Sequence, residues 1–273
     1  MLATIRLGSD LLLSSSRLKG ARVGVVCNHA SVDRGFRHVI DRVAATEGVI
    51  LAAIFGPQHG FRSDVQDNMV ETPHRDDPRR RVPIYSLYSE TREPTPEMLR
   101  GVDVLLVDLQ DIGARIYTYI YTMANCLRAA ARHGVPVIVC DRPNPIGGTA
   151  VEGDRLRRGW ESFVGLFPIP MRHGMTIGEL AKLFNKEFGI GASLDVIPME
   201  GWTRSAYGDS SGLSVGLIFG WIVLWPLVAA AAGAVPIGIV VHNGPSALPQ
   251  FVVALVLLPS LLARGLAAEM FAP

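Results

Sequence analysis

The sequence predicts an α/β protein built on a mostly parallel sheet with flanking helices. Four short apolar segments rich in Val, Ile and Leu lack the polar alternation of a strand with one face in water. Segments with a helical periodicity of about 3.6 residues lie between them. Strands that alternate with helices imply crossover connections, which place helices on the faces of a parallel sheet.

The predicted strands are residues 22–27, 49–55, 102–107 and 135–140. Turn-forming or polar residues bound each of them, and each has the length of a strand rather than of a helix. Continuous apolar runs of this kind are typical of strands that are covered on both faces.

Three helices are predicted between and after these strands. The first has apolar residues at i, i+3, i+4 and i+7, namely Phe36, Val39, Ile40 and Val43. The second covers residues 119–133 and ends at Gly134, a residue type that favours the left-handed conformation after a helix. The third covers residues 177–188, and the Thr176/Glu179 spacing predicts a capping box at its start.

Two nucleotide-binding motifs are missing. The first predicted strand runs into residues 27–31 (Cys-Asn-His-Ala-Ser), which contain no glycine-rich phosphate turn, and GxxxxGK[ST] does not occur. The formal net charge of +1 gives no sign of a nucleic-acid partner. We therefore expect neither a nucleotide cofactor nor nucleic acid.

The cysteines and two histidines give no metal signal. Cys27, Cys126 and Cys140 are an odd, widely spaced set, which argues against a disulfide framework and favours buried apolar roles. His59 and His173 each precede a glycine and lack a third ligand at a diagnostic spacing, so no metal is predicted. They are candidates for ligand binding, or for structural hydrogen bonds.

The N-terminus predicts no signal peptide. Residues 1–20 lack a basic start, an apolar stretch of about 7–15 residues and a small-residue cleavage site. The chain as it stands is therefore expected in the cytoplasm, and an upstream exporting segment is left open.

The composition changes abruptly near residue 212. Residues 210–263 carry no formal charge, and the run 213–241 is longer than the roughly 20 apolar residues that span a bilayer. We therefore divide the chain into residues 1–212 and an uncharged tail, 213–273. Two explanations of the tail stay open: a membrane anchor within residues 213–262, or a truncated or frame-shifted end, which its prolines favour.

Polar clusters follow all four predicted strands. Their members are Asn28 and His29, Gln58 and His59, Asp108, Gln110 and Asp111, and Asp141, Arg142 and Asn144. Open α/β sheets bind ligands beyond the carboxyl ends of their strands. The clusters therefore predict a site for a small polar ligand such as a sugar, with helix capping and turns as the alternative.

Each polar type suits a sugar in a different way. Asp108 and Asp111 can accept hydrogen bonds from hydroxyl groups, and Gln110 offers both a donor and an acceptor. Arg142 either forms a local ion pair with Asp141 or binds a ligand carboxylate.

Glycoside hydrolysis usually needs two carboxyl groups. Glu71 and Glu152 lie in loops punctuated by Pro and Gly, and they are our candidates, against the alternative of plain solvated glutamates. Glu179 is set aside because the capping box accounts for it.

Several longer segments together resemble one enzyme family. They are residues 23–28 (Val-Gly-Val-Val-Cys-Asn), 56–62 (Gly-Pro-Gln-His-Gly-Phe-Arg), 82–88 (Val-Pro-Ile-Tyr-Ser-Leu-Tyr), 103–122, 141–148 (Asp-Arg-Pro-Asn-Pro-Ile-Gly-Gly), 162–165 (Ser-Phe-Val-Gly) and 170–180 (Pro-Met-Arg-His-Gly-Met-Thr-Ile-Gly-Glu-Leu). In this order the segments resemble the NamZ-type exo-β-N-acetylmuramidases, and the resemblance runs to about Leu213.

The resemblance implies a Rossmann-like domain, a second smaller domain and an active site between the two. It implies hydrolysis of a terminal β-linked N-acetylmuramic acid from peptidoglycan fragments by glutamates, without a cofactor. Two departures stand out. The family commonly has glutamate where this chain has Gln58, which cannot supply a proton as an acid, and the apolar tail replaces a polar second domain.

The sequence therefore predicts a muramidase-like glycoside hydrolase that acts on N-acetylmuramyl sugars of peptidoglycan. Glu71 and Glu152 would be catalytic, and the substrate would be bound by Asn28, Gln58, His59, Asp108, Gln110, Asp111, Arg142, Asn144 and His173. The alternatives are a non-catalytic sugar- or peptidoglycan-binding protein, tethered to a membrane by its tail, and an inactive truncated product.

Overall fold

The structure is a computed structural model that describes residues 5–62 and 71–207. The predicted tail of residues 213–273 lies outside the described residues, so the membrane anchor, the frame-shifted end and the cytoplasmic location stay predictions. Within the described part of the chain, no helix is both long and apolar enough to cross a membrane.

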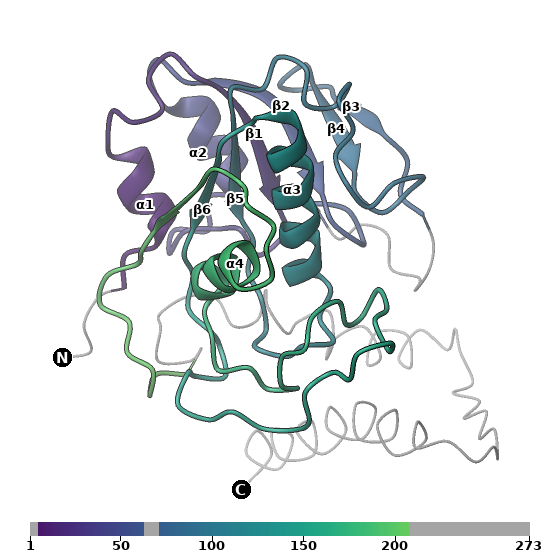
Figure 1. Ribbon diagram of the computed structural model, residues 1–273. Helices are drawn as coiled ribbons and strands as arrows, with labels where there is room; N and C mark the ends of the chain where they lie inside the picture. The colour runs from purple at the N-terminus through teal and green to yellow at the C-terminus, as the bar shows by residue number, and fades with distance from the viewer. Residues whose placement is uncertain (1–4, 63–70, 208–273) are drawn as a thin grey trace, which may run out of the picture. The chain divides into compact units, whose positions relative to one another are not determined.

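The described residues form seven strands and four helices (Figure 1). The strands are β1 (Arg22–Cys27), β2 (Ile50–Gly56), β3 (Arg75–Asp77), β4 (Val82–Ser86), β5 (Val104–Asp108), β6 (Val137–Cys140) and β7 (Leu194–Ile197). The helices are α1 (Gly8–Leu13), α2 (Val39–Ala45), α3 (Tyr119–His133) and α4 (Ile177–Lys186).

All seven strands belong to one sheet, in the order β3-β4-β2-β1-β5-β6-β7. Every pairing is parallel except that of the edge strand β3 with β4, which confirms the predicted mostly parallel sheet. The six parallel strands have the 3-2-1-4-5-6 order of dinucleotide-binding sheets. Their order reverses between β1 and β5, and this switch point is where such sheets hold their ligand.

Helices cover both faces of the sheet (Figure 1). Val26 of β1 packs in one core cluster with α3 and α4, whereas its neighbours Val25 and Cys27 pack in a second cluster with α1 and α2. Successive side chains of a strand point to opposite faces, so a strand covered on both sides must be apolar throughout. All three cysteines are free and buried, as expected of small apolar residues.

The predicted helix ends agree closely with the structure. Helix α3 has the predicted bounds, and Gly134 ends it with a φ of 68°. At the start of α4 the side chain of Thr176 accepts the Glu179 N–H, which confirms the capping box. Helix α2 begins at Val39 rather than at Phe36, because Phe36 has a φ of 59° and the His38 side chain caps the helix.

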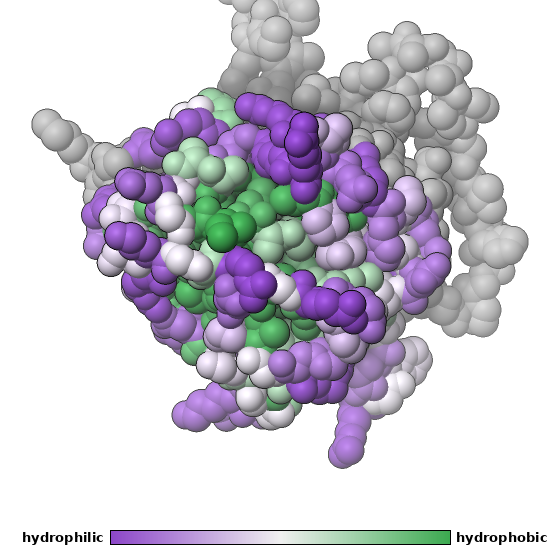
Figure 2. Space-filling view, turned by 90° about the horizontal axis from the view of Figure 1, so that it is seen from above, coloured by the Kyte–Doolittle hydropathy of each residue, from purple (hydrophilic) through white to green (hydrophobic). Residues whose placement is uncertain are grey.

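Figure 2 shows the face that lies opposite the long segment between β6 and α4. Hydrophobic surface at its centre is surrounded by hydrophilic residues. A shallow groove at the amino ends of β5, β6 and β7 includes Val104, Pro136 and Leu194. The ion pairs Arg17–Asp195 and Arg22–Asp103 include residues of its rim, so these charges already have protein partners.

Candidate functional site

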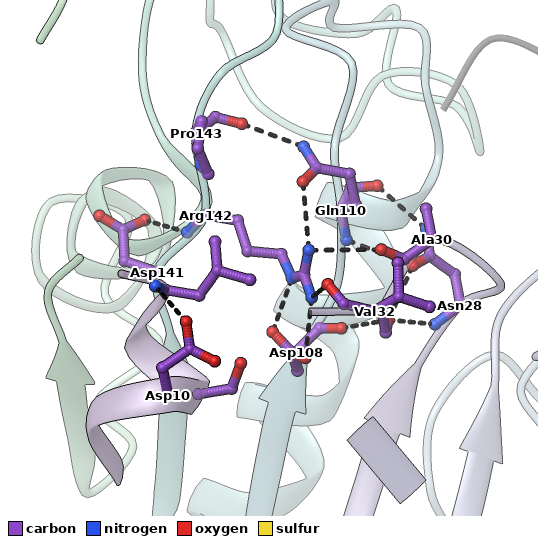
Figure 3. A network of polar contacts seen from close by, with 12 residues as sticks. Asp10, Asn28, Ala30, Val32, Asp108, Gln110, Asp141, Arg142 and Pro143 are labelled. Atoms are coloured by element: carbon purple, nitrogen blue, oxygen red, sulfur yellow. Dashed lines mark hydrogen bonds and ion pairs between the residues drawn. The ribbon is translucent and has the colours of Figure 1, made fainter. Parts of the chain in front are cut away.

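A buried ion pair lies at the switch point of the sheet (Figure 3). Asp108 is the last residue of β5, and Arg142 follows β6 by two positions. The Arg142 guanidinium binds the Asp108 carboxylate in a forked arrangement, with Nε–Oδ1 at 2.7 Å and Nη2–Oδ2 at 3.1 Å. The exposed fractions are 2% for the Arg142 side chain and 0% for that of Asp108.

The other donors of Arg142 also have partners within the protein. Nη2 donates to the Val32 carbonyl at 2.9 Å, and Nη1 lies 3.3 Å from the Ala30 carbonyl and 3.5 Å from Gln110 Oε1. The first of the two alternatives for Arg142, a local ion pair with Asp141, is therefore wrong, because the partner is Asp108. That Arg142 binds a ligand carboxylate stays a prediction, and its donors are bound to these protein partners.

Asn28 and Gln110 tie β1 to β5 beside this ion pair (Figure 3). The Asn28 amide donates to the Gln110 carbonyl at 3.0 Å and accepts the Gln110 N–H at 3.3 Å. The Gln110 amide in turn donates to the carbonyls of Asp111, at 2.8 Å, and Pro143, at 3.0 Å. Both side chains are buried, and their hydrogen bonds hold together the loops that follow β1, β5 and β6.

Asp141 supports the start of α4. Its carboxylate accepts the Gly178 N–H at 2.8 Å and the Thr176 hydroxyl at 3.0 Å. Burial raises the pKa of Asp141, and these hydrogen bonds oppose the rise. The capping role that we considered for strand-end aspartates therefore applies to Asp141.

Asp111 and His173 form a second buried pair. Asp111 Oδ2 accepts the Gly113 N–H at 2.8 Å and lies 3.2 Å from His173 Nε2. His173 Nδ1 accepts the Met175 N–H at 3.1 Å, so the ring proton belongs on Nε2, which donates to Asp111. Asp111 Oδ1 is buried and has no hydrogen-bond partner within the described residues.

Asn144 and Gly113 fix the loop that carries Asp111. The Asn144 amide donates to the Met175 carbonyl at 2.9 Å and accepts the Ile146 N–H at 3.1 Å. Gly113 has a φ of 85°, and a Cβ on it would lie 2.4 Å from Asn144 Oδ1. The loops after β5 and β6 therefore touch at a point where only glycine fits.

Gln58 joins the end of β2 to the start of α3. Its side-chain carbonyl accepts the Thr118 hydroxyl at 3.1 Å, a contact that a glutamate carboxylate could also make. The adjacent Tyr117 and Tyr119 rings pack edge to face, with centroids 4.5 Å apart. Tyr117 was not among the predicted site residues, although it lies in the segment 103–122 that resembles the family. His59 is partly buried and has a φ of 70°, in the turn that begins at Pro57.

The two candidate catalytic glutamates are exposed. Glu152 pairs through its backbone with Arg172, and its carboxylate lies 3.2 Å from Arg172 Nη1. Arg172 precedes His173, so the strip 172–173 contacts both Glu152 and Asp111. Glu71 precedes Thr72, whose N–H donates to the Tyr88 carbonyl just after β4. Glu71 therefore lies near the end of β4, and Glu152 near the Asp111 loop.

The network at the switch point predicts a pH dependence of stability through His38. His38 Nδ1 accepts the Ile40 N–H, and Nε2 lies 2.9 Å from the Asn28 carbonyl. Burial lowers the pKa of His38, and the contact with the Asn28 carbonyl opposes this. The unfolded chain therefore takes up the proton at a higher pH, near 6.5, and the free energy of unfolding should fall as the pH drops below that value.

Asparagine in place of His38 keeps a cap acceptor but does not titrate. Urea unfolding at several pH values between 5 and 7.5 should give a smaller fall in stability for His38→Asn than for the unchanged chain. Identical pH profiles would contradict the role of His38.

The strand order and the closed switch point define a Rossmann-like α/β domain that lacks the phosphate turn of the dinucleotide-binding proteins. A family model described as "Exo-beta-N-acetylmuramidase NamZ, N-terminal" matches residues 23–216. The chain belongs to this family.

Known relatives agree with this assignment. The chain is 48% identical over 211 residues to the peptidoglycan beta-N-acetylmuramidase NamZ of Bacillus subtilis strain 168. The aligned region covers 77% of this chain and 51% of that relative. A crystal structure of a DUF1343 family protein from Bacteroides fragilis NCTC 9343 is similar, with a TM-score of 0.73, 38% identity and coverage of 85% of this chain and 60% of that one.

A second DUF1343 family protein from the same organism gives a TM-score of 0.64 and 32% identity, and covers 75% of this chain and 54% of its own. The chain thus spans about half the length of the curated relative that it matches.

Proposed function

We propose that this chain is the sugar-binding, N-terminal part of a glycoside hydrolase that releases terminal β-linked N-acetylmuramic acid from peptidoglycan fragments. The observation that carries the proposal is the 48% identity over 211 residues to a protein named as a peptidoglycan β-N-acetylmuramidase. The buried polar groups at the carboxyl ends of the strands support it, because this is the edge at which open α/β sheets bind ligands.

The predicted site residues take two roles in this proposal. Asn28, Asp108, Gln110 and Arg142 form the buried frame, because their polar groups bind one another. Gln58, His59, Asp111, Asn144 and His173 belong to the loops above this frame and would bind or orient the sugar. In this proposal the buried frame, with its ion pair, occupies the place where dinucleotide-binding sheets hold the dinucleotide, and the sugar binds to the loops above it.

Glu71 and Glu152 remain the candidates for the acid–base chemistry. A glycosidase usually needs one carboxyl group to protonate the leaving oxygen and a second to act as base or nucleophile. Glu152 lies beside the positive charge of Arg172, which suits a group that acts as an ionised carboxylate. Glu71, near the end of β4, would then be the proton donor that Gln58 cannot be.

The test is release of a chromophore from a β-linked N-acetylmuramide by the purified full chain. We expect turnover, and we expect Glu71→Gln and Glu152→Gln each to lower kcat at least tenfold, because each removes a carboxyl group from the reaction. Glu200→Gln is a matched control, since Glu200 forms an exposed ion pair with Arg6. Unchanged turnover in both site variants would contradict the assignment of the two glutamates.

A second candidate is a non-catalytic muramyl-sugar-binding protein. Two observations favour it: the chain matches only about half of its relative's length, and Gln58 is no acid. Calorimetric binding of N-acetylmuramic acid without turnover of the chromogenic substrate would support this candidate over the enzyme.

A further inference from the structure

Three buried side-chain atoms of the described residues lack a hydrogen-bond partner, namely Asp111 Oδ1, Arg172 Nε and Trp202 Nε1. In residues 5–62 and 71–207, Asp111 Oδ1 is the one buried carboxylate oxygen without a hydrogen bond. The residue is 5% exposed, so bulk water does not surround the carboxylate. A buried acceptor that stays unsatisfied costs about 1–3 kcal/mol, and more when it is charged. This oxygen therefore needs a donor from outside the described protein groups.

The direction of this oxygen is fixed by the other half of the carboxylate. Oδ2 accepts two hydrogen bonds, from the Gly113 N–H and from His173 Nε2. His173 is itself held by the Met175 N–H on Nδ1, so its ring cannot turn without losing both contacts. Neither donor to Oδ2 is a cation, so neither neutralises the carboxylate, whose charge is shared by its two oxygens.

The charge of the Asp111 carboxylate affects the pKa of two tyrosines, Tyr117 and Tyr121. Burial raises the pKa of Tyr117, and the neighbouring Tyr119 hydroxyl and the Asp111 carboxylate raise it further. Burial also raises the pKa of Tyr121, with a smaller contribution from Asp111. Tyr117 lies in the same loop as Asp111, between β5 and α3, and is partly buried. An acceptor and an aromatic ring in one loop match a donor that is attached to an apolar group.

We infer that Asp111 recognises the 2-acetamido group of the sugar: Oδ1 accepts its N–H, and Tyr117 contacts its methyl group. His173 is a positioning residue that holds the carboxylate for this contact. The inference rests on the proposed function, since N-acetylmuramic acid carries that group at C2. Its lactyl carboxylate is repelled by Asp111 and points away. A hydroxyl at C2 brings no methyl group for Tyr117.

Asp111→Asn tests this inference because its geometry is determined. The Asn carbonyl must take the place of Oδ2, since the Gly113 N–H and His173 Nε2 both donate there. The new NH₂ group then takes the place of Oδ1, so an acceptor becomes a donor without a change of shape. The variant therefore keeps the hydrogen bonds of the loop, but its NH₂ group faces the N–H of the ligand and cannot accept a hydrogen bond from it.

The measurement is the ratio of two dissociation constants, obtained by calorimetry with the full chain. The ligands are N-acetylmuramic acid and the same 3-O-lactyl sugar with a hydroxyl at C2. We expect the unchanged protein to prefer the acetamido sugar, and Asp111→Asn to lower that preference about tenfold, the effect of one charge-assisted hydrogen bond. Asp103→Asn, which alters the exposed pair with Arg22 at the other end of β5, should leave the ratio unchanged.

The outcomes separate this inference from the proposed function. Binding of both sugars with equal affinity, or an unchanged preference in Asp111→Asn, would overturn the role of Asp111 and leave the muramyl-sugar site standing. Binding of neither sugar by the unchanged chain would overturn both.

His173 is tested by the same ratio. His173→Leu removes the donor to Oδ2 and should reduce the preference, whereas His173→Gln presents an N–H at the same place and should restore most of it. A purely structural role would weaken the binding of both sugars alike, and an unchanged ratio in His173→Leu would refute the positioning role.

Discussion

Arg142→Met should lower the free energy of unfolding by about 3–5 kcal/mol, the usual cost of leaving one charge of a buried pair without its partner. Asp108 is fully buried, and the Arg142 guanidinium is its only cationic partner within the described residues. The carbonyls of Ala30 and Val32 would also lose a donor. Urea unfolding, followed by circular dichroism, measures the change.

The protein contains a matched control for this prediction. Arg22 and Asp103 form the same forked pair at the amino end of β5, but their side chains are 52% and 42% exposed. Arg22→Met should therefore cost no more than about 1 kcal/mol. The double variant Asp108→Asn/Arg142→Met should recover part of the loss, since no buried charge remains. Equal costs for Arg142→Met and Arg22→Met would show that burial does not matter here.

Gly113→Ala should lower the free energy of unfolding by about 3 kcal/mol, the sum of a positive φ and overpacking. A Cβ at this position would lie 2.4 Å from Asn144 Oδ1 and 2.5 Å from Ile146 Cγ1. The loops after β5 and β6 would have to separate, which would also displace Asp111. We expect weaker binding of N-acetylmuramic acid together with the lower stability.

Gly20→Ala measures the backbone strain alone, so its difference from Gly113→Ala gives the steric part. Gly20 has a φ of 82°, close to the 85° of Gly113, but a Cβ there meets nothing within 4 Å. Only the backbone strain of about 1 kcal/mol should remain. If both variants were equally destabilised, the close approach of the two loops would not be the cause.

The sequence predicted the central part of the sheet well, because burial on both faces leaves a continuous apolar signal. The four predicted strands became β1, β2, β5 and β6, shifted by no more than two residues at either end. The strands at the two edges of the sheet, β3 and β4 on one side and β7 on the other, were not predicted. Strand β4 contains Pro83, which is tolerated near a sheet edge but obscures the pattern, and β7 includes the charged Asp195. Helix α1 has only six residues, too few for a periodicity.

The polar strand-end residues were predicted as a set but not as an arrangement. The polar strand ends do converge, as the parallel sheet required, yet the sequence suggested a local Asp141–Arg142 pair rather than the Asp108–Arg142 pair. Which aspartate pairs with Arg142 depends on how far the chain after β6 extends across the sheet. The spacing of residues along the sequence does not give this distance. The Asp111–His173 contact joins residues 62 positions apart for the same reason.

We propose that the muramyl sugar binds at the carboxyl edge of the sheet, around Asp111. Amide chemical shifts, recorded while N-acetylmuramic acid is added to the full chain, locate the bound sugar. We expect changes concentrated in Gln58, His59, Asp111 to Tyr117 and His173. Changes confined to the groove at the amino ends of β5, β6 and β7, or no changes at a millimolar concentration of sugar, would refute this site.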